Sequence, residues 1–150
     1  MITPNRKPRT ISDKWKHLSK GSTGAARTAN KGGLTRRTTM HHHMSAEMQA
    51  CMDACHHCHI TCLSMTTQHC LQVGGPHAAP DHIKIMLDCA QVCATSLDFM
   101  ARGSDQHKLV CGICAQICRA CAASCKGLDG MEECVAACER CAEECEKMAA

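Results

Sequence analysis

The hydrophobic positions between residues 45 and 148 follow a helical period, but cysteine occupies most of them. Within each run the cysteines recur at steps of three or four residues, as in Cys51, Cys55, Cys58 and Cys62. Because a helix turns once in about 3.6 residues, such steps place every thiol of a run on one helix face. Leucine and isoleucine usually occupy that face in a helical bundle. The pattern therefore predicts helices whose buried face is made of sulfur.

Capping and turn residues divide this region into four helices. Ser45, Ser104 and Asp129 are predicted N-caps, and Pro80 opens the second helix. Glycine and proline in the three connections end each helix before the next begins. The predicted ranges, caps included, are 45–73, 80–101, 104–127 and 129–148. Because short connections make neighbouring helices antiparallel, we expect an all-α, antiparallel up-down-up-down four-helix bundle with a Cys-lined core.

The N-terminal part of the chain has a different composition. Residues 1–40 hold ten Lys or Arg and one acidic residue, Asp13, whereas residues 41–150 hold seven basic and thirteen acidic residues. The stretch is rich in Thr, Ser and Gly without sustained periodicity, which is typical of disorder. We therefore expect a disordered basic N-terminal tail over residues 1–43 and a Cys-rich bundle over residues 44–150.

The same stretch bears on partners and location. A basic tail can contact nucleic acid, but we expect a solvated tail with no nucleic-acid partner. Arg36 and Arg37 precede polar residues rather than the apolar segment of an export signal. We find no stretch with the length of a transmembrane helix, so we expect no membrane association and a cytoplasmic protein.

The residues on the ladder are soft metal ligands. The chain has 16 Cys, 10 Met and 11 His but one Phe, one Trp and no Tyr, so little else is available to fill a core. Such cysteine density also occurs in disulfide scaffolds, but thiols aligned on one helix face point the same way and bridge poorly. Thiolates and thioethers select Cu(I), Zn(II) or iron–sulfur clusters.

The charge balance of a buried site distinguishes between these metals. Sixteen thiolates carry sixteen negative charges, and four zinc ions in tetrahedral four-cysteine sites leave eight of them uncompensated. Cu(I) bound by two bridging thiolates gives about one ion per cysteine and a nearly neutral array. We therefore predict multiple Cu(I) ions held by Cys51, Cys55, Cys58, Cys62, Cys70, Cys89, Cys93, Cys111, Cys114, Cys118, Cys121, Cys125, Cys134, Cys138, Cys141 and Cys145.

Methionine and histidine extend the ladder at its ends. The antiparallel topology gathers Met48, Met100 and His107, with Met44 and Met148, at one end of the bundle. We predict His107, Met48 and Met100 as further ligands and this end as the place where metal enters. The opposite end is predicted to be an apolar plug, formed by Cys70, Met86, Cys125, Met131, Leu71, Ile83, Leu87 and Leu128.

Other functions use the same residue types. The Cys51, Cys55 and Cys58 spacing matches that of an iron–sulfur motif, but such motifs lie on loops and this one lies within a predicted helix. We find no nucleophilic triad or glycine-rich phosphate loop, so we do not expect an enzyme. A zinc-buffering or thiol-redox protein using the same ladder remains the alternative to copper binding.

Four segments resemble the bacterial copper storage proteins: Met48 to Cys62, Leu87 to Cys93, Cys111 to Cys125, and Cys134 to Cys145 with the final Lys-Met-Ala-Ala. The similarity covers about residues 44–150, and because no export signal is apparent, the chain resembles the cytosolic branch of the family. It implies a copper storage and detoxification protein whose four-helix bundle fills with Cu(I) through Cys pairs. It also implies a homotetramer, with His and Met residues at one open end for loading. A copper chaperone is the candidate donor.

Overall fold

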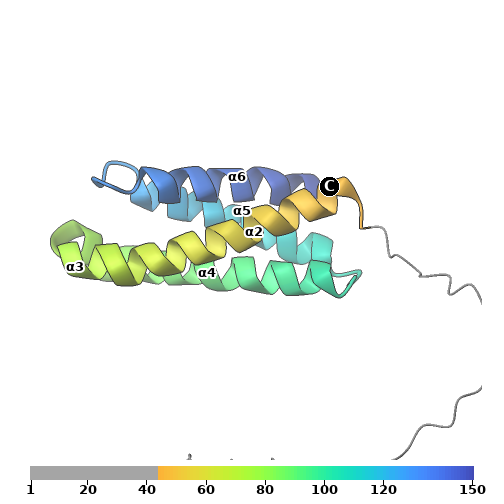
Figure 1. Ribbon diagram of the computed structural model, residues 1–150, viewed down its shortest axis with the longest axis horizontal. Helices are drawn as coiled ribbons and strands as arrows, with labels where there is room; N and C mark the ends of the chain where they lie inside the picture. The colour runs from red at the N-terminus through yellow and green to blue at the C-terminus, as the bar shows by residue number, and fades with distance from the viewer. Residues whose placement is uncertain (1–43) are drawn as a thin grey trace, which may run out of the picture. The chain divides into compact units, whose positions relative to one another are not determined.

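The computed structural model describes residues 44–150, and these form a four-helix bundle (Figure 1). The predicted disordered tail, residues 1–43, lies outside the described residues. The long helices are α2, Ala46–Met65; α4, Pro80–Ala101; α5, His107–Cys125; and α6, Glu132–Ala149. Helix α2 packs against α4 and α6, and α5 packs against the same two helices. The predicted antiparallel bundle is confirmed, and its four inward faces enclose one central column.

The first helical segment begins where predicted. Ser45 is its N-cap, and its hydroxyl accepts a hydrogen bond from the Met48 backbone N–H at 3.1 Å. After α2 the chain continues as a π-helical turn, Thr66–Cys70, and a last helical turn, α3, Leu71–Val73. A π turn holds more residues than an α turn, which shifts the register of the residues that follow it. Cys70, at the end of this turn, is fully buried at the end of the column.

Helices α5 and α6 begin later than their predicted caps. Ser104 is part of a turn, and its carbonyl accepts a hydrogen bond from the His107 N–H, so α5 begins at His107 with Gln106 as N-cap. Asp129 is not the cap of α6, because Gly130 follows it with a φ of 77° and turns the chain before Glu132. The carbonyl of Asp129 instead accepts a hydrogen bond from the His77 ring at 3.0 Å.

The core contains almost no aliphatic side chains. The buried hydrophobic residues among 44–150 are Cys, Ala and Met, and all sixteen cysteines are at most 1% exposed. Several large aliphatic residues lie outside instead, such as Leu109 at 65% and Val73 at 56% exposure. The bundle therefore reverses the usual distribution, with sulfur inside and part of its aliphatic surface outside.

Helix α5 corrects one sequence expectation. Its 19 residues are long and apolar enough, by length and composition, to cross a membrane. One face of the helix, however, is buried in the bundle, where Cys118 contacts Cys93 of α4 and Cys125 contacts Cys134 of α6. The core helix of a bundle passes the same test of length and composition, and the buried thiol face accounts for the apolar composition of α5.

Candidate metal centre

The sixteen thiols form a continuous column along the bundle axis. Sulfur atoms from different helices approach closely, for example Cys62 to Cys138 at 3.5 Å and Cys93 to Cys118 at 3.6 Å. Neighbours on one helix are slightly farther apart, as for Cys58 and Cys62 at 3.9 Å. These separations are far longer than a disulfide bond of about 2.05 Å, and all sixteen cysteines are free.

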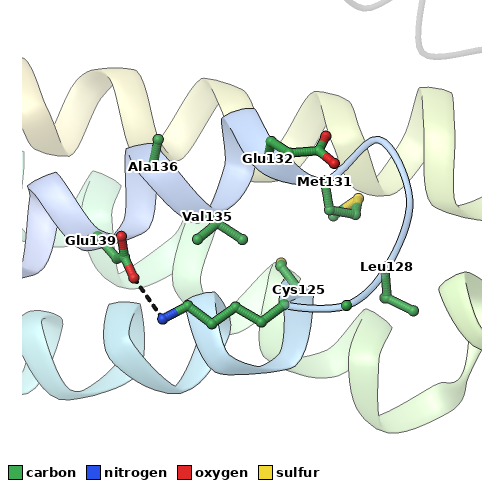
Figure 2. Close-up of a pocket in the computed structure, with 9 residues that line it drawn as sticks. Cys125, Leu128, Met131, Glu132, Val135, Ala136 and Glu139 are labelled. Carbon is green, nitrogen blue, oxygen red and sulfur yellow. Dashed lines mark ion pairs between the residues drawn. The ribbon is translucent and has the colours of Figure 1, made fainter.

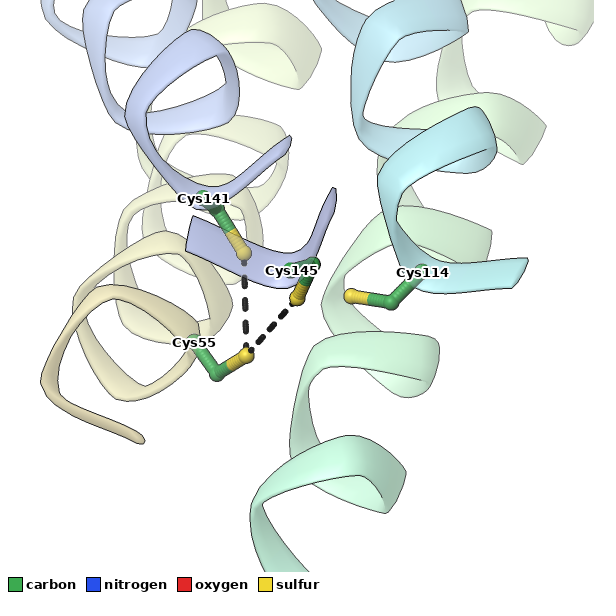
Figure 3. Close-up of side chains that lie close together, drawn as sticks. All are labelled: Cys55, Cys114, Cys141 and Cys145. Atoms are coloured by element: carbon green, nitrogen blue, oxygen red, sulfur yellow. Dashed lines mark hydrogen bonds between the residues drawn. The ribbon is translucent and has the colours of Figure 1, made fainter. Parts of the chain in front are cut away.

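The column contains groups of four thiols whose sulfurs lie within 4.8 Å of one another. Figure 3 shows one of them, formed by Cys55 of α2, Cys114 of α5, and Cys141 and Cys145 of α6. Cys55 contacts Cys145 at 3.5 Å and Cys141 at 3.7 Å. Such a group can surround a soft metal ion from three helices at once.

Neighbouring groups share members. Cys114 and Cys141 also belong to a group with Cys93 and Cys118, and that group in turn shares two thiols with the next one along the axis. A shared thiol that serves both groups must bridge two metal ions. The geometry thus fits a chain of bridged ions better than a set of separate, closed sites.

Hydrogen bonds between thiols divide the column into donors and acceptors. Cys118 and Cys114 lie 3.9 Å apart. With Cys118 donating, the bond lowers the pKa of Cys114 and raises the pKa of Cys118. The pKa of Cys58 is lowered as well, first of all by the neighbouring thiol of Cys118. Thiolates that metal ions need are therefore favoured at some positions of the buried column, while others hold their protons until an ion replaces them.

Methionines line a pocket at the end where metal was predicted to enter. The pocket has a volume of about 570 Å³, and its walls include Met44, Met48 and Met100. Met100 is buried, and its sulfur lies 3.9 Å from that of Cys111 in the column. A path of thioether and thiol sulfur thus connects this pocket to the column.

The third predicted ligand at this end, His107, is placed differently. It is half-buried at the first position of α5, and its Nδ1–H donates to the Ser104 carbonyl at 2.7 Å. The described residues that line the methionine pocket do not include it. The structure therefore brings Met48 and Met100 together in one pocket but does not place His107 in its lining.

The opposite end differs from the predicted apolar plug. Leu71 and Leu87 are 54% and 42% exposed, so neither closes the bundle, whereas Ile83 and Leu128 pack against the core. The buried side chains here are polar or sulfur-bearing: Cys70, His82, Met86, Cys125 and Met131. The sequence analysis assigned Met86 to the apolar plug and predicted neither His82 nor Met86 as a ligand. The sequence feature that could have identified them is their spacing, since His82 lies seven residues and Met86 three residues before Cys89.

Residues 37–150 match the family described as copper storage protein. The chain belongs to the copper storage protein family. This match confirms the resemblance found in the sequence, and copper storage as the class of function it predicted. The buried groups of four thiols supply the metal-binding capacity that such a function requires.

Several proteins of known structure are similar to this chain. A crystallised protein of Nitrosospira multiformis is 57% identical, with a TM-score of 0.68, over 69% of this chain and 94% of that one. The Cu(I)-bound copper storage protein BsCsp3 is 35% identical, with a TM-score of 0.64, over 69% of this chain and 99% of that one. The apo form of Csp3 from Bacillus subtilis is 36% identical, with a TM-score of 0.57, over 68% and 98% of the two chains.

The uncharacterised cysteine-rich protein YhjQ of Bacillus subtilis is 35% identical over 67 residues. The matched stretch covers 45% of this chain and 55% of YhjQ, so the chain spans about half the length of that curated relative.

Proposed function

We propose that this copper storage protein holds about one Cu(I) ion per cysteine in a chain of thiolate-bridged ions, without catalytic turnover. The observation that carries the proposal is the sharing of thiols between neighbouring groups of four along a fully buried column. The similarity to BsCsp3, which is a Cu(I)-bound protein, supports Cu(I) as the ion.

Charge favours Cu(I) over zinc at this site. Three groups of four can each bind one ion without sharing a thiol, and together they use twelve thiolates. One such set is Cys55, Cys114, Cys141 and Cys145; Cys58, Cys89, Cys93 and Cys118; and Cys62, Cys121, Cys134 and Cys138. Three zinc ions supply only half of the positive charge that twelve buried thiolates require, and buried uncompensated charge is costly. Cu(I) ions equal in number to the thiolates leave the column neutral. The proton of each thiol is released as its ion binds.

An anaerobic Cu(I) titration of the fully reduced full chain against a chromogenic chelator tests this proposal. We expect an endpoint near the cysteine count of 16. An endpoint of four or fewer would exclude storage and support the alternative, a zinc-buffering protein with discrete sites. A thiol-redox role is less favoured because all sixteen thiols are buried, and reactive thiols need access.

We further propose that copper enters at the methionine pocket. Met44, Met48 and Met100 are neutral, soft ligands that can bind Cu(I) weakly and pass it to Cys111. His107, one helical turn before Cys111 on α5, is proposed as an auxiliary ligand. A copper chaperone is the expected donor, because it can carry bound Cu(I) to the pocket and transfer it to the methionine ligands.

The proposed setting is the cytoplasm, and the proposed assembly is a homotetramer. Exposed aliphatic residues on α5, Leu109 at 65% and Ile113 at 48%, support self-association, because such residues are better covered than left in water. They border a surface pocket of about 300 Å³ that also includes Gly112 and Ala149. Native mass spectrometry of the wild type and of Leu109→Glu tests the assembly, with loss of the tetramer expected in the variant.

A further inference from the structure

Three soft ligands of different kinds meet at the end of the bundle that lies opposite the methionine pocket. The sulfur of Cys70 lies 3.7 Å from His82 Nε2 and 3.7 Å from the Met131 sulfur. Cys70 and Met131 are fully buried and His82 is 5% exposed. They come from the π-helical turn, from the first turn of α4 and from the residue before α6.

The His82 ring is held so that one nitrogen faces the sulfurs. Its Nδ1 lies 2.8 Å from Ser124 Oγ on α5. With Nδ1–H donating to that hydroxyl, the lone pair of Nε2 points to Cys70. Metal-binding histidines usually have their second ring nitrogen fixed by such a partner, which sets both the tautomer and the ring orientation.

The separations match those expected around one three-coordinate ion. Metal bonds to sulfur and to imidazole nitrogen are about 2.3 and 2.0 Å in zinc sites, which gives about 3.7 Å between S and N at a trigonal centre. The same geometry gives about 4.0 Å between two sulfurs. The observed 3.7 Å from Cys70 to each of the other two ligands is close to these values.

We propose that Cys70, His82 and Met131 form a mixed-ligand Cu(I) site that ends the thiolate column. One thiolate and two neutral ligands balance the single charge of Cu(I), so this site is neutral without bridging to another ion. The Cys70 thiol releases its proton as the ion binds. The site rests on the proposed copper storage function, but it differs from the column in containing a nitrogen ligand.

A surface pocket of about 280 Å³ lies between α5 and α6 at this end of the bundle, and Cys125, Leu128 and Met131 are among the residues that line it (Figure 2). An ion pair of 2.8 Å between Lys126 and Glu139 lies at its rim. Cys125 in turn contacts the sulfurs of Met86 at 3.4 Å and Cys134 at 3.6 Å. The mixed-ligand site therefore lies where the column comes close to solvent a second time.

Nitrogen NMR of the full chain, labelled with ¹⁵N-histidine, tests the site directly. Cu(I) is titrated anaerobically to the endpoint, and the His82 signals are assigned from their absence in His82→Asn. We expect the His82 Nε2 resonance to shift on loading while that of the exposed His57 stays in place. A His82 Nε2 resonance that is unchanged at full loading would overturn the proposal.

Chelator competition on matched variants gives a second readout. Met131→Leu keeps the side-chain volume and removes the thioether, and Ser124→Ala frees the His82 ring; His57→Ala is the control. We expect both test variants to hold one ion at least tenfold more weakly than the wild type, and the control to be unchanged. If the wild type takes up ions near its cysteine count and the test variants bind every ion as tightly as the wild type does, this site is excluded and the storage function is not. A wild type that takes up few ions would instead overturn the storage function.

Discussion

The sulfur atoms of Cys62 and Cys138 lie 3.5 Å apart, although 76 residues separate them in the chain. Cys62 and its neighbour on the same helix, Cys58, are 3.9 Å apart. Contacts between helices are thus at least as close as those along one helix. Metal ions in the column are therefore expected to join helices, and copper loading should tighten the whole bundle rather than individual helices.

Replacing Cys138 should lower copper capacity by more than one ion. Cys138 belongs to at least two groups of four thiols, one with Cys58 and Cys89 and one with Cys121 and Cys134. A serine oxygen is a poor ligand for Cu(I), so Cys138→Ser removes a bridging thiolate from both groups. We expect a loss of about two ions in the anaerobic titration, with helicity confirmed by circular dichroism. Unchanged capacity would contradict the bridged arrangement.

Replacing Ser96 by cysteine should raise copper capacity. Ser96 is fully buried on α4 three residues after Cys93, and its hydroxyl has no hydrogen-bond partner within residues 44–150. Ser96→Cys adds a thiol of similar size to the ladder, and we expect about one further ion at the endpoint. Ser96→Ala should leave capacity unchanged and stabilise the apo protein by about 1 kcal/mol, because an unsatisfied buried hydroxyl is removed. A lower capacity in the cysteine variant would show that the position is sterically closed.

Removing thioethers from the methionine pocket should slow copper uptake. The double variant Met48→Leu and Met100→Leu conserves volume and removes two of the sulfurs that line the pocket. We expect a several-fold slower loading rate in stopped-flow competition with a Cu(I) chelator, and the same final capacity. Met65→Leu, half-buried and far along α2, is the matched control. Equal rates in all three proteins would place copper uptake elsewhere.

The apo protein should lose stability at alkaline pH, partly through Cys70. Burial is the main cause that raises the pKa of Cys70 above the ordinary value of 9.0. The folded chain therefore holds this proton more tightly than the unfolded chain does. The contribution of the Cys70 thiol to the free energy of unfolding is complete below pH 9.0, and it is lost as the pH rises through the raised pKa of the folded state.

This effect can be measured by urea unfolding of the reduced apo protein between about pH 7 and 11. Above the ordinary thiol pKa, one such group contributes a slope of up to about 1.4 kcal/mol per pH unit. We expect the free energy of unfolding of Cys70→Ala to decline less steeply there than that of the wild type, whatever its absolute stability. Parallel curves for the two proteins would contradict the raised pKa.

The helices and their buried faces follow from local patterns in the amino-acid sequence. Steps of three and four residues place Cys51, Cys55 and Cys58 on one face, and this depends only on the pitch of the helix. The cap at Ser45 and the break at Gly74 are equally local, because they depend on hydrogen bonds and backbone angles within a few residues. The copper storage family could be identified from the same ladder, since its spacing is the signature of the site.

Which thiols meet, and which side chains come into contact at each end of the bundle, depends on how the helices pack together. Cys55 shares a group with Cys114, Cys141 and Cys145 because the connections fix the axial offset between neighbouring helices. No local sequence pattern encodes that offset. The predicted caps Ser104 and Asp129 failed for a related reason: turn geometry and the hydrogen bond from His77 to the Asp129 carbonyl moved the helix starts. The meeting of Cys70, His82 and Met131 likewise required three separate segments to pack together, and that packing turned an expected apolar plug into a candidate copper site.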